Sequence, residues 1–252
     1  MEIIMDAVEK YYDSLLHIGV TNFDSATNGE NQFLGDYLTG LAAPVVFDVG
    51  ANVGKFTEAV MNQNETAVVY AFEPHPVTYE KLKGNDFGLR FHPFNYGLGE
   101  TNADALLYDY MDQDGSEHAS VHRGVIEQIH HGEALSRNIR IITLDAFVRE
   151  HGIDRIQMLK VDTEGNEMAV FQGGEKTIRS GAIDVIQFEF NEMNVISRTF
   201  FKDFFDFLPE YDFFRLTHQG ALFIKKYVPC FCEIFAYQNI VCVKKGLNVF
   251  NV

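Results

Sequence analysis

The stretch VVFDVGANVGKF, residues 45–56, decides the fold of this chain. Its β-branched and aromatic residues run up to an acid, Asp48, and two glycines follow four positions apart, directly before a lysine. This order predicts a buried strand, a tight glycine turn and the first turn of a helix. Because ligands of parallel sheets bind at the carboxyl ends of the strands, the turn is also the first candidate for a binding site.

Two common phosphate-binding turns do not fit this stretch. A Walker loop has four residues between its first glycine and the Gly-Lys pair, and then a Ser or Thr that holds magnesium. Here three residues separate Gly50 from Gly54, and Phe56 occupies the hydroxyl position. The dinucleotide fingerprint G-x-G-x-x-G also fails, since Asn52 stands at its second glycine.

The charges around the turn indicate a cationic nucleoside instead. Asp48 directly precedes the glycines, and Glu73 ends the next strand, 23 residues after Gly50. A carboxylate at the second position accepts ribose hydroxyls, whereas an acid beside the turn repels a pyrophosphate and attracts an ammonium or a sulfonium. S-adenosylmethionine meets both requirements. The alternative is a purely structural strand, turn and helix start.

Strands and helices alternate along the chain from residue 44. We expect strands at 45–49, 67–72, 90–94, 157–161 and 185–190, and helices at 55–61, 76–83, 144–150 and 166–180. Most of the strand segments are continuously apolar, as strands buried on both faces are. The pattern predicts an α/β fold, in which helices cover both faces of a parallel sheet. Two further strands are expected near the C-terminus, at 213–217 and 239–244.

The chain is expected to form one domain with an N-terminal extension. Residues 1–43 read as a helical extension, with an amphipathic helix over 2–18 and a second helix over 33–41. Residues 44–252 form the domain itself. Within it, residues 112–138 are rich in Asp, Gly, His and Ser without a clear period, which indicates a long insertion or lid.

Composition narrows the functional classes. The 252 residues are 46% hydrophobic and 22% charged, as in ordinary soluble globular proteins. A formal charge of −16 argues against a broad nucleic-acid surface. No apolar run is long enough to cross a bilayer, and the acidic first residues do not resemble a secretion signal. Three cysteines, an odd and sparse number, favour a reducing cytoplasm over a disulfide framework.

Several segments together resemble a known family. FDVGANVGKFT, AFEPHPVTYEKLKGN, YGLGE, ITLDAF and MLKVDTEGNEMAVFQGGEKTI occur in this order between residues 45 and 191. Their order and spacing resemble the FkbM family of S-adenosylmethionine-dependent methyltransferases. The resemblance implies the class I methyltransferase (Rossmann-like) fold, with a seven-stranded, mostly parallel sheet and one antiparallel C-terminal strand. It also implies O-methylation of a sugar, glycan or secondary metabolite.

The resemblance places the cofactor by residue. Gly50, Asn52 and Gly54 would line its methionine end, Glu73 would bind the ribose, and the turn at residues 96–100 would border the adenine. The full set expected around the cofactor is Asp48, Gly50, Ala51, Asn52, Gly54, Glu73, Pro74, Tyr96, Gly97 and Asp162. Some positions depart from the family pattern. The Tyr-Gly pair at 96–97 stands where small apolar residues are usual, Asn166 follows the DTEG segment, and Gly174 stands where alanine is common. These departures leave the substrate contacts open.

Four charged residues mark the expected catalytic centre. Lys160 and Asp162 lie on one side of their strand, Glu164 follows in the turn, and Glu189 ends the next strand. Because a hydroxyl is a weak nucleophile at neutral pH, we expect Asp162 or Glu164 to accept its proton while Lys160 orients the carboxylates. The alternative is a structural Lys160–Asp162 ion pair with Glu164 as a helix cap.

The irregular segment adds weaker candidates. The histidines at 118 and 122 are four apart, and a divalent ion on Asp162, Glu189 and Asn191 is conceivable, but no metal site is predicted. His118, His122, His130 and His131 are expected to face solvent. The loop 114–120 reads as a substrate-side lid, with Ser116 and Ser120 as hydrogen-bond donors.

Rival functions remain open from the sequence. The chain is alternatively an N-methyltransferase, a metal-assisted methyltransferase or another nucleoside-dependent enzyme on the same fold, or else a module that binds the cofactor without catalysis. The acids beyond the cofactor loop favour an enzyme. The partner is expected to be a small-molecule or carbohydrate acceptor, and not a nucleic acid. The phenylalanine-rich stretch 200–208 reads as core, with a homodimer face as the alternative.

Overall fold

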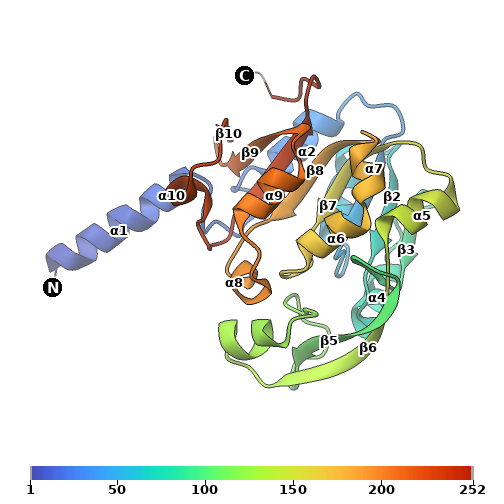
Figure 1. Cartoon of the computed structure of the whole chain (residues 1–252), viewed down its shortest axis with the longest axis horizontal. Coiled ribbons are helices and arrows are strands. Elements are labelled where there is room, and N and C mark those ends of the chain that lie inside the picture. Colours follow the sequence, from blue (N-terminus) through green and yellow to red (C-terminus); the bar gives the residue numbers. More distant parts are fainter. Residues whose placement is uncertain (1, 251–252) are drawn as a thin grey trace.

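An eight-stranded sheet forms the centre of the computed structural model, which describes residues 2–250 (Figure 1). The strand order is β3-β2-β1-β7-β8-β11-β9-β10. β11 runs antiparallel to both of its neighbours, and the strands from β3 to β8 are parallel. In chain order the strands are β1 (Val45–Val49), β2 (Val68–Phe72), β3 (Phe91–Phe94), β7 (Ile156–Val161), β8 (Ile183–Glu189), β9 (Tyr211–Thr217), β10 (Gly220–Ile224) and β11 (Asn239–Lys244).

This topology confirms the expected fold class and adds one strand. Seven strands, from β3 to β9, form the mostly parallel sheet with β11 as the antiparallel member. The eighth strand, β10, returns from β9 through a tight hairpin and pairs with it at the edge. All seven expected strands are present, and their observed bounds lie within two residues of the expected ones.

Helices cover both faces of the sheet and bury two separate cores. On one face, α5 (Leu144–His151), α6 (Glu167–Gly173), α7 (Glu175–Arg179) and α9 (Phe201–Phe207) pack their apolar residues against the strands. On the other face lie α2 (Glu30–Leu38), α3 (Lys55–Gln63) and α4 (Pro76–Lys83). Phe201 and Phe204 of α9 are fully buried, which confirms a core role for them, whereas Phe200 is exposed.

The helix expected over residues 166–180 is broken into α6 and α7 at Gly174. A Cβ at this position would lie 2.6 Å from Cδ2 of Leu144, so the chain packs directly against α5 there. Glycine is the residue that permits so close an approach. The sequence pattern of apolar residues continues through the break, which is why periodicity alone does not reveal it.

The N-terminal helix α1 (Glu2–His17) extends away from the body of the molecule (Figure 1). Val8, Tyr11 and Tyr12 on this helix are exposed. Within residues 2–250 no helix is both long and apolar enough to span a membrane. The division of the chain at residue 43 stays a prediction.

A second, three-stranded sheet stands beside the main one, in the order β4-β6-β5. Its strands are β4 (Gly97–Leu98), β5 (Ala103–Tyr110) and β6 (Ala134–Ile142), and a π-helix, η1 (Val125–Ile129), lies in the connection. The expectation of an irregular segment over 112–138 is therefore wrong in part, because it contains η1 and the start of β6. Both long strands mix exposed, half-buried and buried residues, so neither shows the continuous apolar run of a strand buried on both faces.

Candidate active site

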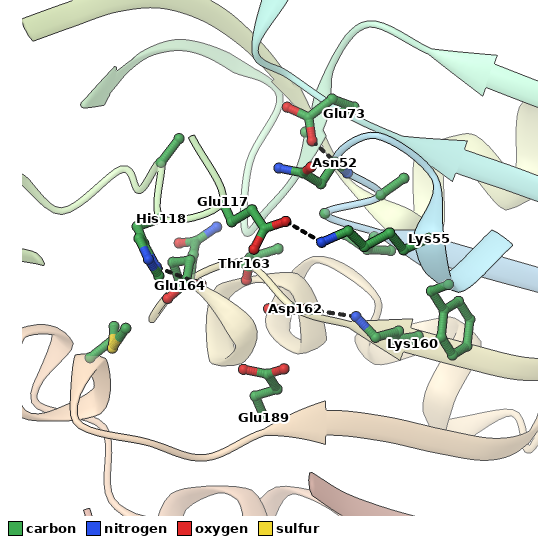
Figure 2. A pocket seen from close by; sticks show the side chains of 18 of the residues that line it. Asn52, Lys55, Glu73, Glu117, His118, Lys160, Asp162, Thr163, Glu164 and Glu189 are labelled. Carbon is green, nitrogen blue, oxygen red and sulfur yellow. Dashed lines mark hydrogen bonds and ion pairs between the residues drawn. The ribbon is translucent and has the colours of Figure 1, made fainter. Parts of the chain in front are cut away.

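A cavity of about 590 Å³ opens at the carboxyl ends of β1, β2, β7 and β8 (Figure 2). One wall consists of the glycine turn after β1, the end of β2 and the start of β4. A second wall consists of residues 116–119 and Val121 from the β5–β6 connection and the turn after β7. This volume suits a nucleoside-sized ligand together with part of a second molecule.

The glycine turn is shaped by close backbone packing. Gly50 has a φ of +83°, and a Cβ there would lie 1.7 Å from the carbonyl oxygen of Asp162. The backbone N–H groups of Gly50 and Ala51 both donate to the carbonyl of Phe72, at 3.0 Å. The backbone of the turn is thus fixed against two neighbouring strands, which leaves a surface that a ligand can approach closely.

Glu73 faces the cavity from the end of β2. Its Oε2 accepts a hydrogen bond from the backbone N–H of Asn52 at 2.9 Å, and its Oε1 accepts one from the N–H of His75 at 2.7 Å. Burial raises the pKa of Glu73 to about 7, although these two hydrogen bonds lower it. Each oxygen keeps a further lone pair, so the carboxylate can still accept hydroxyl donors of a ligand.

Three residues expected around the cofactor do not line the cavity. Strand alternation turns Asp48 beneath α3, where its Oδ2 accepts a hydrogen bond from Thr57 at 2.6 Å. Gly54 lies at the start of α3 with a φ of +92°, and Tyr96 packs on Phe72 and Phe94. The expected contact of Asp48 with a cationic ligand is therefore wrong. The remaining members of that set, namely Gly50, Ala51, Asn52, Glu73, Pro74, Gly97 and Asp162, do line the cavity.

Lys160 and Asp162 form a nearly buried ion pair at the floor of the cavity. The Nζ atom of Lys160 lies 2.7 Å from Oδ2 of Asp162, and 7% of the lysine side chain is exposed. Burial alone would lower the pKa of Lys160, but Asp162, Glu30 and other carboxylates around it raise that pKa overall. The lysine is therefore a permanent cation, and one oxygen of Asp162 is committed to it.

Glu164 and Glu189 complete the expected cluster. Burial, followed by the charge of Asp162, raises the pKa of both carboxyl groups well above the usual range. Glu164 adopts a φ of +53°, and its Oε2 is buried without a hydrogen-bond partner. Glu189 accepts a hydrogen bond from Asn191 at 3.4 Å. All four residues expected at the catalytic centre line one cavity (Figure 2).

Sequence reasoning missed groups that reach the cavity from distant segments. Lys55 forms a 2.5 Å ion pair with Glu117 across the mouth, which joins α3 to the β5–β6 connection (Figure 2). His118 lines the cavity and stacks on His130, with ring centroids 4.2 Å apart. The expectation that the histidines of this segment face solvent is confirmed for His131 and holds in part for His118, whose side chain is 43% exposed, whereas His130 is half-buried. Nothing in the aperiodic segment signals these contacts, because they depend on the fold of the loop.

The two serines expected to serve a substrate are occupied within the protein. Ser116 donates its hydroxyl to Asp109, and Ser120 donates to the backbone carbonyl of Glu164 at 2.7 Å. Both side chains are buried, at 4% and 0% exposure. The substrate-donor role is therefore wrong for both, and they order the loop instead.

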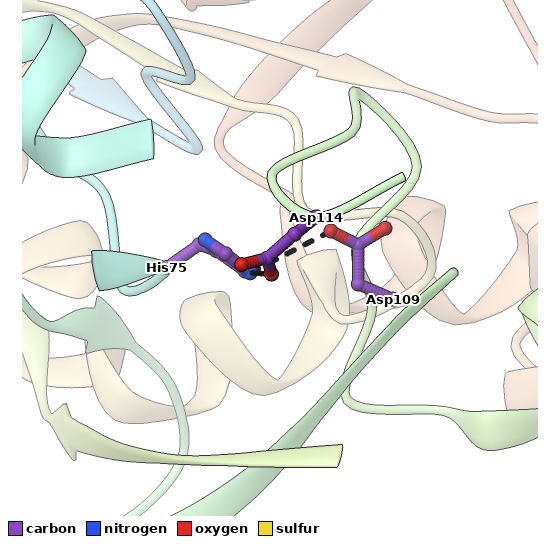
Figure 3. Close-up of side chains that lie close together, drawn as sticks. All are labelled: His75, Asp109 and Asp114. Atoms are coloured by element: carbon purple, nitrogen blue, oxygen red, sulfur yellow. Dashed lines mark ion pairs between the residues drawn. The ribbon is translucent and has the colours of Figure 1, made fainter. Parts of the chain in front are cut away.

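Among residues 2–250, the histidines and acids that could together hold a metal are His75, Asp109 and Asp114 (Figure 3). His75 directly precedes α4, Asp109 lies on β5, and Asp114 belongs to the β5–β6 connection. The sets considered from the sequence, the histidines at 118 and 122 and the residues Asp162, Glu189 and Asn191, are not part of this group.

Comparison with known proteins locates the same region. The chain matches a family model described as the methyltransferase FkbM domain over residues 48–214, which is more than half of its length. The hexuronic acid methyltransferase AglP of Haloferax volcanii is 28% identical over 138 residues, 54% of this chain and 52% of that protein. The 31-O-demethyl-FK506 methyltransferase FkbM of Streptomyces tacrolimicus is 28% identical over 156 residues, 52% of this chain and 59% of that protein. The chain thus spans between 52% and 59% of these relatives.

Solved structures show a looser likeness. An rRNA methylase from Streptococcus thermophilus has a TM-score of 0.46 at 13% identity, with coverage of 88% of this chain and 98% of that one. A TehB-like SAM-dependent methyltransferase from Corynebacterium glutamicum has a TM-score of 0.43 at 10% identity, with coverage of 97% and 100%. Neither likeness bears on the ligand or the substrate.

Proposed function

We propose that this chain, which belongs to the FkbM family of S-adenosylmethionine-dependent methyltransferases, methylates a hydroxyl group of a sugar, glycan or secondary metabolite. One observation carries the proposal. The glycine turn and Glu73 occupy one wall of the same cavity whose floor holds Lys160, Asp162 and Glu189. A site for a nucleoside and a site for proton chemistry therefore adjoin.

The residues of the first wall fit the methyl donor. Glu73 would accept the ribose hydroxyls, the turn from Gly50 to Asn52 would meet the methionine end, and Gly97 would border the adenine. The close approach of Gly50 to the carbonyl oxygen of Asp162 holds the turn in place at the edge of the cavity. The excess of carboxylates around the cavity suits a ligand with a positive charge. S-adenosylmethionine supplies an electrophilic methyl group, which leaves a neutral thioether sulfur.

The floor of the cavity would serve the acceptor. Asp162 is tied to Lys160 at 2.7 Å, so this pair fixes the position of the carboxylate. Glu164 holds a buried oxygen without a partner and is free to act on a neighbouring group. Glu189 faces the same space from the adjoining strand, where it can accept a hydrogen bond from the acceptor. Holding the hydroxyl close to the methyl group contributes the rest of the rate acceleration.

The test separates binding from transfer. Calorimetry with S-adenosylhomocysteine measures the cofactor site, and transfer of a labelled methyl group is then assayed on sugars, glycosides, polyketide alcohols and amines. Methylated hydroxyls support the proposal. Transfer to amines alone indicates an N-methyltransferase, and tight binding without any transfer indicates a binding module.

Two variants test the carboxylates of the floor. Asp162→Asn and Glu164→Gln are expected to lower turnover by about 100-fold, because loss of a group that takes part in proton transfer, directly or by orienting the base, removes an effect of this size. Glu175→Gln, which breaks an exposed pair with Arg179, is the control and should be unchanged. Retained turnover in both floor variants would remove their proposed role.

A further inference from the structure

His118 is placed to act on a ligand in the cavity. It comes from the β5–β6 connection, and of the histidines in the described part of the chain it is the one that lines this cavity. Its ring stacks on His130 at 4.2 Å and meets Tyr110 edge-on at 6.3 Å, so its plane is held from two sides. The side chain is 43% exposed, which leaves part of the ring accessible to an acceptor.

Glu164 stands beside this ring. Its Oε1 lies 3.9 Å from Nδ1 of His118 (Figure 2). Burial and the nearby Asp162 raise the pKa of Glu164. A cationic ligand in the cavity opposes that effect and favours the carboxylate. An ionised carboxylate next to Nδ1 stabilises the tautomer with the proton on Nδ1 and leaves Nε2 as a free base.

A buried polar cluster fixes the loop that carries His118. Asp109 accepts hydrogen bonds from the N–H groups of Gly115 and Ser116, at 2.7 and 3.0 Å, and from the Ser116 hydroxyl. The same hydroxyl oxygen accepts a hydrogen bond from the backbone N–H of His118 at 3.1 Å. The backbone that presents His118 is thus tied to β5 through two buried side chains.

The cluster also ties the loop to the cofactor side of the cavity. Nε2 of His75 lies 3.1 Å from Oδ1 of Asp114 (Figure 3). Arg137 donates hydrogen bonds to both oxygens of Asp114, at 2.8 and 2.6 Å. His75 follows Glu73 by two residues. With the N–H of Tyr110 included, Asp109 has four donors on its two oxygens, which fills its lone pairs and leaves none for a metal. His75, Asp109 and Asp114 therefore anchor the loop that carries His118.

We propose that His118 is the general base of the reaction and that Glu164 is a positioning residue, which holds the ring with Nδ1 protonated. This inference rests on the proposed function, since it concerns the hydroxyl acceptor of the same site. In the step, the O–H bond of the acceptor breaks and its electron pair remains on oxygen for the new bond to the methyl carbon. The bond from that carbon to sulfur breaks, and its electron pair stays on the sulfur as a neutral thioether. The proton goes to Nε2 of His118, and the resulting imidazolium later releases it to water.

The first test is spectroscopic and needs no acceptor. In protein with ¹⁵N-labelled histidine rings and bound sinefungin, which carries an amine where the cofactor carries its sulfonium, the His118 ring is expected as the Nδ1–H tautomer. Glu164→Gln should abolish this preference without unfolding the protein. His118→Gln assigns the signal, and His131→Gln is the control. A predominant Nε2–H tautomer, or a tautomer unaffected by Glu164→Gln, would overturn the proposal.

The second test separates a base from a structural residue. With an acceptor found in the panel, His118→Ala is expected to lower kcat by about 100-fold or more, while S-adenosylhomocysteine binding is unchanged. Added imidazole should restore part of the lost rate, and His131→Ala should behave as the parent protein. Full turnover in His118→Ala refutes the base and leaves the proposed function intact. Failure of the parent protein to methylate any acceptor refutes the proposed function, and the base role with it.

Discussion

The two walls of the cavity are built on different physical principles. The cofactor wall, from the turn at Gly50 to Glu73, is held by backbone hydrogen bonds and by close approach of main chain to main chain. The acceptor wall, from residue 114 to His118 and the turn at Glu164, is held by charged and polar side chains. The first wall tolerates almost no added volume, whereas the second depends on charge. Asn52 donates a hydrogen bond to the carbonyl of Ser116 and His75 pairs with Asp114, and away from these two links we expect each wall to respond to substitution on its own.

The largest effect is expected from filling the turn of the cofactor wall. In Gly50→Ala, the new methyl group would lie 1.7 Å from the carbonyl oxygen of Asp162, on a backbone with a φ of +83°. We expect loss of S-adenosylhomocysteine binding by at least about 100-fold, because strain of several kcal/mol has to be relieved by moving the turn.

A second glycine provides the matched control. Gly40 has a φ of +84°, but nothing lies within 4 Å of its Cβ position. Gly40→Ala should therefore cost only backbone strain, about 1 kcal/mol, and leave binding unchanged. Calorimetry on both variants checks the difference. Equal binding in the two would break the claim that the cofactor wall depends on close packing.

The next largest effect concerns the buried cation between the two walls. Lys160→Met leaves Asp162 and its neighbouring carboxylates without their counter-charge, and we expect a loss of about 3–5 kcal/mol in the free energy of unfolding. Lys55→Met breaks the exposed pair with Glu117 and should cost under about 1 kcal/mol. Urea unfolding measures both values, and a similar small cost for the two variants would contradict the account.

A smaller effect is expected from the pH dependence of Glu73. The unfolded chain releases this proton near pH 4.5, whereas the folded protein keeps it until about pH 7. The folded state therefore binds more protons in this window, and its stability falls as pH rises from 4.5 to 7. The change is about 3 kcal/mol at most. Urea unfolding of the parent protein and of Glu73→Gln should show stability curves that separate as pH rises from 4.5 to 7, because only the parent loses stability in this window. Parallel curves would argue against the raised pKa.

The smallest effect is expected in the anchor of the acceptor wall. Arg137→Met removes two hydrogen bonds from Asp114 at a partly exposed site, so we expect a stability change of under about 1 kcal/mol. Amide exchange of residues 114–118 should nevertheless become faster, while exchange in the turn at Gly50 stays unchanged. Faster exchange on both walls would show that they are not independent.

The cofactor wall was predictable from the sequence because its pieces are local. The strand at 45–49 is a continuous apolar run, the glycines mark the turn, and Glu73 follows the next such run. Asp48 was misplaced because its charge was considered without the alternation of the strand, which turns it beneath α3. The signal was present, since Asp48 shares a strand face with Val46.

The acceptor wall was not predictable in the same way. β5 and β6 pair with each other and expose much of their surface, so their sequences lack a buried pattern. The approach of His118 to the cavity depends on the bonds between Asp109 and Ser116, seven residues apart in an aperiodic segment. Such contacts arise from the folded loop and leave no periodic trace in the sequence.

The most direct test of the central claim is titration calorimetry of S-adenosylhomocysteine, NAD and ATP into the parent protein and into Glu73→Ala. We expect S-adenosylhomocysteine to bind at one site per chain and its affinity to fall strongly in Glu73→Ala. We expect neither NAD nor ATP to compete for this site. Binding of NAD or ATP at this site, or affinity for S-adenosylhomocysteine that survives the loss of Glu73, would contradict the account.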